Sequence, residues 1–374
     1  MRGFAILGIL LLNIRDFSML EGAYALPASY HHFDTLSDRV AWAAGEILWS
    51  RKFYPMLALL FGAGIVLMAE GAEAGGRRPA VDHYRRMAGL IAIGMIHGYL
   101  IWHGDIMCNY ALCGIIAYPF RKLRARTLLI LVLLLLTAET ALQARSSGSR
   151  DDTFYHIDDI PGWAYEEYTT YRGPWAGQLA MRARRSFENQ VNGLQYIPQT
   201  LALILCGMAL VNLGWPAVTR GSRRLRDAAI SCCPAAWLVS AMAIGWWAAS
   251  GFKNGRQWFL MNSWMQLGGI IGMAGYLAAI QWWLGTGHLQ RLAAIPAAIG
   301  RTALSNYIAQ SVMASYIFHG QGLGLFESVG RAGQLVWVLA IWILQILLTC
   351  VWLHYFSRGP AEWFLRWISG RRSA

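Results

Sequence analysis

A mostly apolar stretch of the chain, residues 96–115, contains four side chains that could do chemistry. It reads IHGYLIWHGDIMCNYALCGI and includes His97, His103, Asp105 and Asn109. A carboxylate beside an imidazole fixes the tautomer of the ring and raises its basicity, as a general base requires. Asp105 and Asn109 are four residues apart and share a helix face. We expect that face to look across a tight hairpin at His97, with His97 as the catalytic base and Asp105 as its partner.

The same residues also have structural interpretations. A buried His97 can donate to a backbone carbonyl, and Asp105 can cap the helix that follows it, where the helix dipole favours an anion. A metal site would need ligands converging from the hairpin tip, but the chain has no HxxxH or HExxH spacing there, so we predict no metal. His103 and Asn109 are predicted to contact a substrate.

Two other apolar segments carry polar side chains. Asn13 and Asp16 share a face in GILLLNIRDF, and an amide there can donate to a developing oxyanion or simply hold two helices together. Thr302, Asn306 and Gln310 recur every four residues and form a stripe that must point away from lipid. We predict that Asn306 and Gln310 belong to a substrate-binding wall, with interhelical hydrogen bonding as the alternative.

The composition identifies the kind of protein that positions these residues. The 374-residue chain is 56% hydrophobic and only 14% charged, with a mean hydropathy of +0.37, whereas soluble domains carry about 25% charged residues. Its six cysteines form no CxxC pair, so neither a disulfide framework nor a zinc site is indicated. The sequence predicts an all-α, polytopic membrane helix bundle.

Apolar segments long enough to cross a bilayer define the predicted organisation. We expect about ten transmembrane helices within a single transmembrane domain, residues 1–374, and one long extracytoplasmic loop, residues 144–194. Amphipathic helices are expected at 34–50 and around 175–189. The predicted spans are 3–20, 53–70, 84–103, 104–120, 126–143, 195–215, 228–250, 258–284, 302–319 and 334–356.

The orientation follows from the basic residues of the short loops, which collect on the cytoplasmic side. Alternate connections are basic, so both termini are predicted to be cytoplasmic and the tip at His103 to Asp105 extracytoplasmic. The net charge of +12 is then mainly a topology signal, and we expect membrane lipid but no nucleic acid as a partner. The basic connections are Arg77 to Arg86, Arg121 to Arg126, Arg220 to Arg226, and Arg291 with Arg301.

Several of these motifs together resemble the bacterial YeiB-like family. They are RGFAILGILLLNI, KFYPMLALLFGAG, the block from Ile96 to Leu123, GRTALSNYIAQSVMASYIFHGQGLGLF and WILQILLTCVWLHYFSRGPAEWFLRW. The resemblance runs almost end to end and is most specific in the last hundred residues. The family is grouped with transmembrane acyltransferases similar to heparan-α-glucosaminide N-acetyltransferase, which move an acyl group from cytosolic acyl-CoA to an acceptor across the membrane.

The resemblance implies roles for particular residues. Asn13 corresponds to an active-site asparagine of the acetyltransferase, whose catalytic histidine falls where this chain has Tyr24. His97 is then the favoured base, because it belongs to the motif shared with the YeiB-like proteins, and His31 and His32 remain alternatives. Acyl-CoA, in the form of acetyl-CoA, is the expected co-substrate, with its phosphates on Arg77, Arg78, Arg121, Arg124 and Arg126.

The leading hypothesis is therefore a multi-pass acyltransferase of the bacterial inner membrane. Its acceptor would be an extracytoplasmic hydroxyl or amine on a small molecule, glycan or lipid. A transporter or exporter that uses the same polar interior is the alternative, and a scaffold whose polar residues only join helices is the third. The sequence leaves open whether the chain forms a homo-oligomer.

Overall fold

The structure is a computed structural model that describes residues 1–25, 27, 33–147, 162–215, 221–253, 255–287 and 290–370. Regular secondary structure in these residues is helical, without a β-strand, which confirms the predicted all-α class. The first half contains α1 (Arg2–Ser18), α2 (Glu21–Ala25), α3 (Leu36–Leu48), α4 (Phe53–Ala74), α5 (Pro79–Ile96), the π-helix η3 (His97–Ile101), α6 (Met107–Ala117), the 3₁₀ helix η4 (Tyr118–Lys122) and α7 (Ala125–Ser147).

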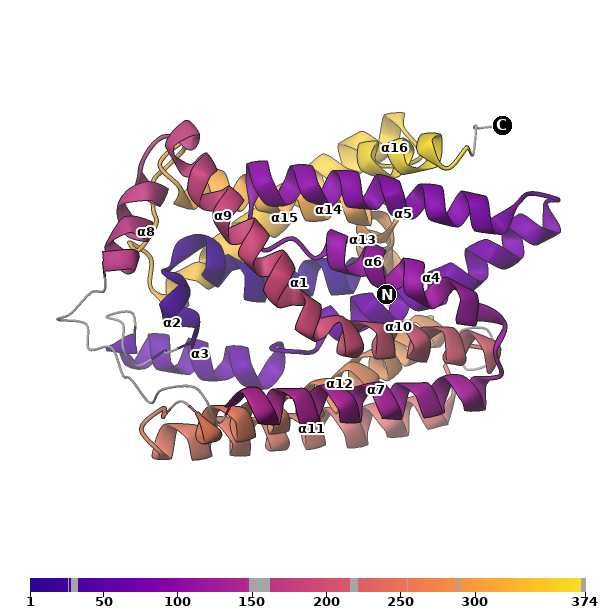
Figure 1. Cartoon of the computed structure of the whole chain (residues 1–374), viewed down its shortest axis with the longest axis horizontal. Helices are drawn as coiled ribbons and strands as arrows, with labels where there is room; N and C mark the ends of the chain where they lie inside the picture. Colours follow the sequence, from indigo (N-terminus) through magenta and orange to yellow (C-terminus); the bar gives the residue numbers. More distant parts are fainter. Residues whose placement is uncertain are drawn as a thin grey trace.

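The second half continues the bundle. It contains α8 (Gly162–Arg172), α9 (Trp175–Gly193), the 3₁₀ helix η5 (Leu194–Tyr196), α10 (Ile197–Asn212), α11 (Arg223–Ala249), α12 (Arg256–Thr286), α13 (Gln290–Arg301), α14 (Ala303–Phe318), α15 (Arg331–Tyr355) and α16 (Pro360–Ile368). In Figure 1 the long helices run along the horizontal axis, with α8 at the left end and the α4–α5 connection at the right.

Six helical segments of the described chain are long and apolar enough to cross a membrane. They are Leu36–Ala74, Ala125–Arg145, Trp175–Asn212, Arg223–Ala249, Arg256–Thr286 and Arg331–Tyr355, and they support a multi-pass membrane protein. Each of them covers all or most of one of the predicted spans.

The other four predicted spans fall on shorter or interrupted helices. Helix α1 has 17 residues and α14 has 16, so at 1.5 Å per residue each covers about 24 to 26 Å of a hydrocarbon core about 30 Å thick. The predicted spans 84–103 and 104–120 correspond to α5 and α6 with the π-helix between them. The total of ten crossings therefore remains a prediction.

Both amphipathic helices expected outside the spans are present. Thr35 caps the first of them, α3, by accepting a hydrogen bond from the Asp38 backbone N–H over 3.1 Å. The second, α9, runs from Trp175 to Gly193 and crosses the bundle diagonally in Figure 1. The second of these helices lies within the predicted long loop, residues 144–194, and gives part of it a folded structure.

Helices α4 and α10 approach each other closely because each has a glycine at the crossing. A Cβ at Gly62 would lie 1.9 Å from the Ile204 carbonyl oxygen, and one at Gly207 would lie 1.9 Å from the Leu59 carbonyl oxygen. No side chain fits at either position without moving the backbone of the partner helix. This crossing explains the FGAG motif as a packing site, as small residues often are in membranes.

We expect Gly62→Ala to destabilise the protein by about 1 to 3 kcal/mol, the usual cost of inserting atoms into a packed interior. Thermal unfolding in detergent, followed by tryptophan fluorescence, measures the change. Gly71→Ala on the same helix is the matched control, because no atom lies within 4 Å of a Cβ there. Equal unfolding temperatures for the two variants would contradict this account of the crossing.

Candidate functional site

The π-helix η3 joins α5 to the turn before α6 and carries His97 at its first position. The Trp102 N–H donates to the His97 carbonyl over 2.9 Å, a hydrogen bond that spans five residues. Single π turns occur frequently at functional sites, because the wider turn shifts side chains and frees backbone carbonyls. The change from α-helix α5 to π-helix η3 therefore determines how the backbone is oriented at His97, the predicted base.

Helix α9 holds the freed carbonyls of this turn. The Ser186 hydroxyl donates to the Gly98 carbonyl over 2.6 Å. The indole of Trp175 and the guanidinium of Arg182 both donate to the Leu100 carbonyl over 3.1 Å. The long loop therefore contributes directly to the shape of the hairpin.

His97 and Asp105 lie in contact across the hairpin. The His97 Nδ1 is 3.0 Å from the Asp105 Oδ1, and both side chains are buried. The second carboxylate oxygen, Oδ2, accepts the Cys108 N–H over 2.9 Å at the start of α6. Gly94 permits this closeness, because a Cβ there would lie 2.8 Å from Asp105 Oδ2. Asp105 thus caps α6 and orients the imidazole with one carboxylate.

The other imidazole nitrogen, His97 Nε2, is buried and has no hydrogen-bond partner among the described residues. A carboxylate that accepts from Nδ1–H favours the tautomer in which Nε2 is the acceptor. The ring packs against two aromatic side chains, with centroid distances of 5.1 Å to Tyr307 and 6.1 Å to Trp102. An oriented imidazole with an unused basic nitrogen has the arrangement of a general base.

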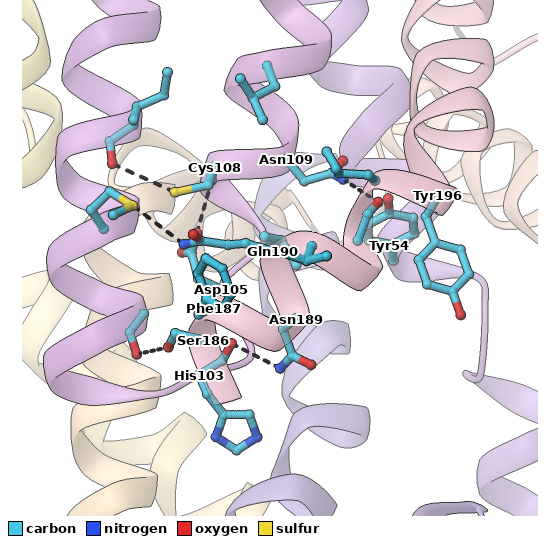
Figure 2. Close-up of a pocket in the computed structure, with 18 of the residues that line it drawn as sticks. Tyr54, His103, Asp105, Cys108, Asn109, Ser186, Phe187, Asn189, Gln190 and Tyr196 are labelled. Carbon is cyan, nitrogen blue, oxygen red and sulfur yellow. Dashed lines mark hydrogen bonds between the residues drawn. The ribbon is translucent and has the colours of Figure 1, made fainter. Parts of the chain in front are cut away.

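A cavity of about 540 Å³ lies between the hairpin, α9 and the start of α10, and we call it the α9 cavity. Figure 2 shows its labelled side chains, with Asp105 near the centre and the His103 ring directed away from most of the others. The cavity is lined by Tyr54, Ile91, Met95, Gly98, His103, Asp105, Ile106, Cys108, Asn109, Leu112, Ser186, Phe187, Asn189, Gln190, Val191, Gly193, Leu194, Tyr196 and Gln199.

A second cavity of about 560 Å³ lies among α1, α4, α5, α6, α14 and α16, and we call it the α1 cavity. Its wall is mainly apolar, with charged side chains at Arg2, Arg86 and Glu362. The remaining lining residues are Met1, Ile6, Leu57, Leu60, Phe61, Ala63, Gly64, Leu67, Met68, Leu90, Ile106, Met107, Tyr110, Trp215, Ala303, Leu304, Tyr307 and Leu365.

The His97–Asp105 pair lies between the two cavities. Asp105 lines the α9 cavity, and Tyr307, which packs on the His97 ring, lines the α1 cavity. Ile106 lines both. His97 itself lines neither and is only 1% exposed. A few side chains therefore separate each cavity from the imidazole.

The two substrate-binding residues predicted on the hairpin both line the α9 cavity. The Asn109 amide donates to the Gly193 carbonyl over 3.3 Å. His103 lies between Asp16, whose Oδ2 is 3.4 Å from its Nε2, and Tyr171, whose hydroxyl is 3.2 Å from its Nδ1. His103 therefore connects the cavity wall to α1 and α8.

The polar residues predicted on α14 and α1 lie elsewhere. Asn306 accepts from the Thr349 hydroxyl over 3.1 Å, and Gln310 donates to the Ile6 carbonyl over 3.0 Å. Both are buried and line neither cavity. Their contacts agree with the alternative given above, in which these residues form hydrogen bonds between helices. Asn13 is half-buried, and no hydrogen bond joins it to His97 or Asp105 in the described chain. His31 and His32 lie outside the described residues.

The five arginines predicted to hold a phosphorylated co-substrate line neither cavity. Arg77 pairs with Asp82 over 2.6 Å, and Arg121 pairs with Glu73 over 3.3 Å. The other three, Arg78, Arg124 and Arg126, are exposed. The basic side chains that line the α1 cavity are instead Arg2 and Arg86.

A buried polar cluster beyond His103 was not predicted from the sequence. Arg182 of α9 donates to Gln178 over 2.5 Å and contacts His319 Nδ1 at 3.1 Å, and it is only 1% exposed. Arg185, one turn later, pairs with Glu167 over 2.8 Å. The sequence signal was the spacing of these polar residues along one face of the amphipathic helix predicted around 175–189.

Burial raises the pKa of Glu167 to about 7, although the Arg185 guanidinium favours the charged carboxylate. Burial also raises the pKa of the Tyr171 hydroxyl above its usual value. Shifted pKa values of this kind are typical of functional sites and of structural ion-pair networks. The cluster therefore extends the polar surroundings of His103 to α8.

Comparisons with known proteins place the chain in a family. Residues 210–372 match the family "Protein of unknown function (DUF418)". The chain is 32% identical to "Uncharacterized protein YeiB" of Escherichia coli K12, over 99% of this chain and 94% of that protein. It is 26% identical to "Uncharacterized protein YxaH" of Bacillus subtilis 168, over 98% of this chain and 92% of that protein.

A third relative is an uncharacterised 39.9 kDa protein of Bacillus acidopullulyticus, 25% identical over the whole of this chain and 92% of its own length. No solved structure matches the chain. The identity to YeiB extends over nearly the full length of both proteins. With its helical, multi-pass architecture, the chain belongs to the YeiB-like family of membrane proteins.

Proposed function

We propose that the protein is a transmembrane acyltransferase, which moves an acyl group, acetyl in the simplest case, from cytosolic acyl-CoA to an extracytoplasmic hydroxyl or amine. The observation that supports this most strongly is the buried His97–Asp105 pair, whose Nε2 has no partner among the described residues and which lies between two cavities. A single base that lies a few side chains from each of two cavities suits the joining of two substrates.

The orientation of the proposal follows the positive-inside rule. The α1 cavity is lined by Met1, Arg2 and Arg86, which belong to the side with the basic connections. The α9 cavity is covered by the helix of the long loop. In the proposed topology both termini and the α1 cavity face the cytoplasm, the short helices complete the ten crossings, and the membrane is the bacterial inner membrane.

The α1 cavity is the proposed donor site. Its apolar wall suits an acyl chain and the pantetheine arm of CoA, and its two arginines suit the phosphates, because guanidinium groups bind phosphate oxygens in a bidentate manner. Arg2 and Arg86 take the place of the five arginines predicted from the sequence as the first phosphate contacts. Tyr307 lines this cavity and packs on the His97 ring, so it marks the part of the cavity where the thioester would lie nearest the base.

The proposed reaction is a direct transfer. His97 Nε2 removes the proton from the acceptor hydroxyl or amine as its oxygen or nitrogen bonds to the thioester carbonyl carbon. The carbon–sulfur bond then breaks, and the imidazolium returns the proton to the CoA sulfur, so that CoA thiol and acylated acceptor leave. Asp105 keeps the ring in the required tautomer, and the oxyanion role of Asn13 remains a prediction.

We expect Arg86→Ala to raise the dissociation constant of CoA by about ten- to a hundredfold, the usual effect of losing a hydrogen bond to a charged group. Thermal stabilisation of the purified protein across a CoA titration gives this constant. Arg224→Ala, at an exposed arginine that lines neither cavity, is the matched control. Equal weakening in both variants would contradict the assignment of the α1 cavity to the donor.

The proposed function is tested with radiolabelled acetyl-CoA and the protein in lipid nanodiscs. Stabilisation by CoA and release of free CoA with labelled acceptor support acyl transfer. A protein that is indifferent to CoA but moves solute across vesicle membranes would establish the transporter alternative, for which the same two cavities would form the path.

A further inference from the structure

The α9 cavity indicates which class of acceptor the proposed acyltransferase would use, and this inference rests on that function. No lysine or arginine is among the described residues that line the cavity. Its one carboxylate, Asp105, is already bound to His97 and to the Cys108 N–H. An anionic head group would therefore meet a carboxylate without a compensating cation, which is costly away from water.

Apart from Asp105 and His103, the polar part of the wall consists of neutral hydrogen-bonding groups. It carries the side-chain amides of Asn109, Asn189, Gln190 and Gln199 and the hydroxyl of Ser186. Amides offer both donors and acceptors to a ligand. Figure 2 shows Asn109, Asn189 and Gln190 around Asp105, so a ligand bound by these amides would place a hydroxyl beside the proposed catalytic pair.

The outer part of the same wall is apolar and exposed. Phe187 is 61% exposed, Leu194 53%, Val191 49% and Leu112 41%. Phe187 and Val191 come from α9, Leu194 from η5 and Leu112 from α6, so they flank the opening of the cavity from two sides. In a bilayer protein, an opening framed by exposed apolar side chains faces lipid.

The outer face of helix α9 carries both apolar and charged side chains. Gln178, Arg182 and Arg185 are buried against the bundle, whereas Phe187 and Val191 are exposed together with Arg184 and Glu188. Such a mixed outer face is typical of a helix at the boundary between lipid and water. The cavity therefore opens sideways between α9 and α6, toward the bilayer.

We propose that the acceptor is an uncharged, hydroxyl-bearing amphiphile, such as a glycolipid, that enters the α9 cavity laterally from the membrane. Its sugar hydroxyls contact the amide wall, and its alkyl chain lies against Phe187, Val191 and Leu194. One hydroxyl oxygen forms the new ester bond while the thioester carbon–sulfur bond of the donor breaks. The hydroxyl proton passes through His97 to the CoA sulfur.

The test uses binding alone, so that it does not depend on acyl transfer. Nanodisc-embedded protein is irradiated with an alkyl glucoside that carries a diazirine in its chain, and labelled peptides are located by mass spectrometry. We expect labelling of residues 187–194, competed by dodecyl glucoside at concentrations at least tenfold lower than those of dodecyl phosphate or free glucose. Equal competition by dodecyl phosphate, or absence of labelling over residues 187–194, would overturn the proposal.

A charge variant tests the role of the amide wall. Gln190→Lys places a cation in the cavity and should shift the preference at least tenfold toward dodecyl phosphate. Asn192→Lys, on the same helix but exposed and outside the cavity wall, should leave the preference unchanged. An identical shift in both variants, or no shift in Gln190→Lys, would count against the proposal.

The two proposals fail separately in these experiments. Stabilisation by CoA without glucoside labelling would remove the acceptor assignment and leave the acyltransferase proposal in place. Labelling and competition as expected, with no response to CoA, would remove the acyltransferase proposal and leave a glycolipid-binding cavity.

Discussion

Replacing His97 with alanine is expected to lower the rate of acetyl transfer from acetyl-CoA by about 10²- to 10⁴-fold, the usual contribution of a positioned general base. The effect should appear mainly in kcat, because the imidazole acts on the proton of the acceptor and lines neither cavity. CoA release and labelled product, measured with the protein in nanodiscs, give both kcat and KM.

Two controls separate chemistry from folding in this experiment. His354→Ala replaces an exposed histidine at the end of α15 and should keep the full rate. Stabilisation by CoA should be retained in His97→Ala, because the α1 cavity is unchanged. A variant that is folded, binds CoA and transfers acetyl at the normal rate would remove His97 from the mechanism.

Replacing Asp105 with asparagine is expected to lower the rate by about 10²- to 10⁴-fold, since an orienting carboxylate acts by fixing the tautomer of its histidine. Asparagine keeps an oxygen that can accept the Cys108 N–H, so the cap of α6 is largely preserved. Its amide N–H₂ beside His97 Nδ1 can instead stabilise the tautomer in which Nε2 carries the proton. The rate is measured as for His97, across a range of pH.

Asp227→Asn, at an exposed position near the start of α11, is the matched control. The double variant of His97 and Asp105 should be about as slow as His97→Ala alone, because the two residues act as one unit. If the logarithmic rate loss of the double variant equalled the sum of the losses of the two single variants, Asp105 would act independently of the imidazole.

The membrane character and most of the long helices were predictable from the sequence. Apolar runs such as 126–143 and 334–356 have lengths in the range needed to cross the hydrocarbon core, and few alternatives exist for such segments in lipid. The change from α-helix to π-helix at His97 was harder to predict from the sequence. The π-turn there depends on donors from α9, at Trp175, Arg182 and Ser186, which are distant in sequence.

The candidate site was predictable only in part. His97 and Asp105 were brought together because eight residues and a tight turn leave them few other positions, and Asn109 followed from helical spacing. Asn306 and Gln310 showed equally clear spacing but pack between helices. Periodicity identifies the buried face of a helix, whereas the neighbour that the face contacts depends on the packing of the bundle.

The sequence by itself determined the all-helical class, the long spans and the hairpin that carries His97 and Asp105, because bilayer thickness and helical spacing are local constraints on the chain. The tertiary structure decided which polar residues line a cavity, which arginines lie near it, and that α9 turns Arg182 and Arg185 inward against the bundle. These outcomes depend on contacts between segments far apart in sequence, whose pairing no local pattern records.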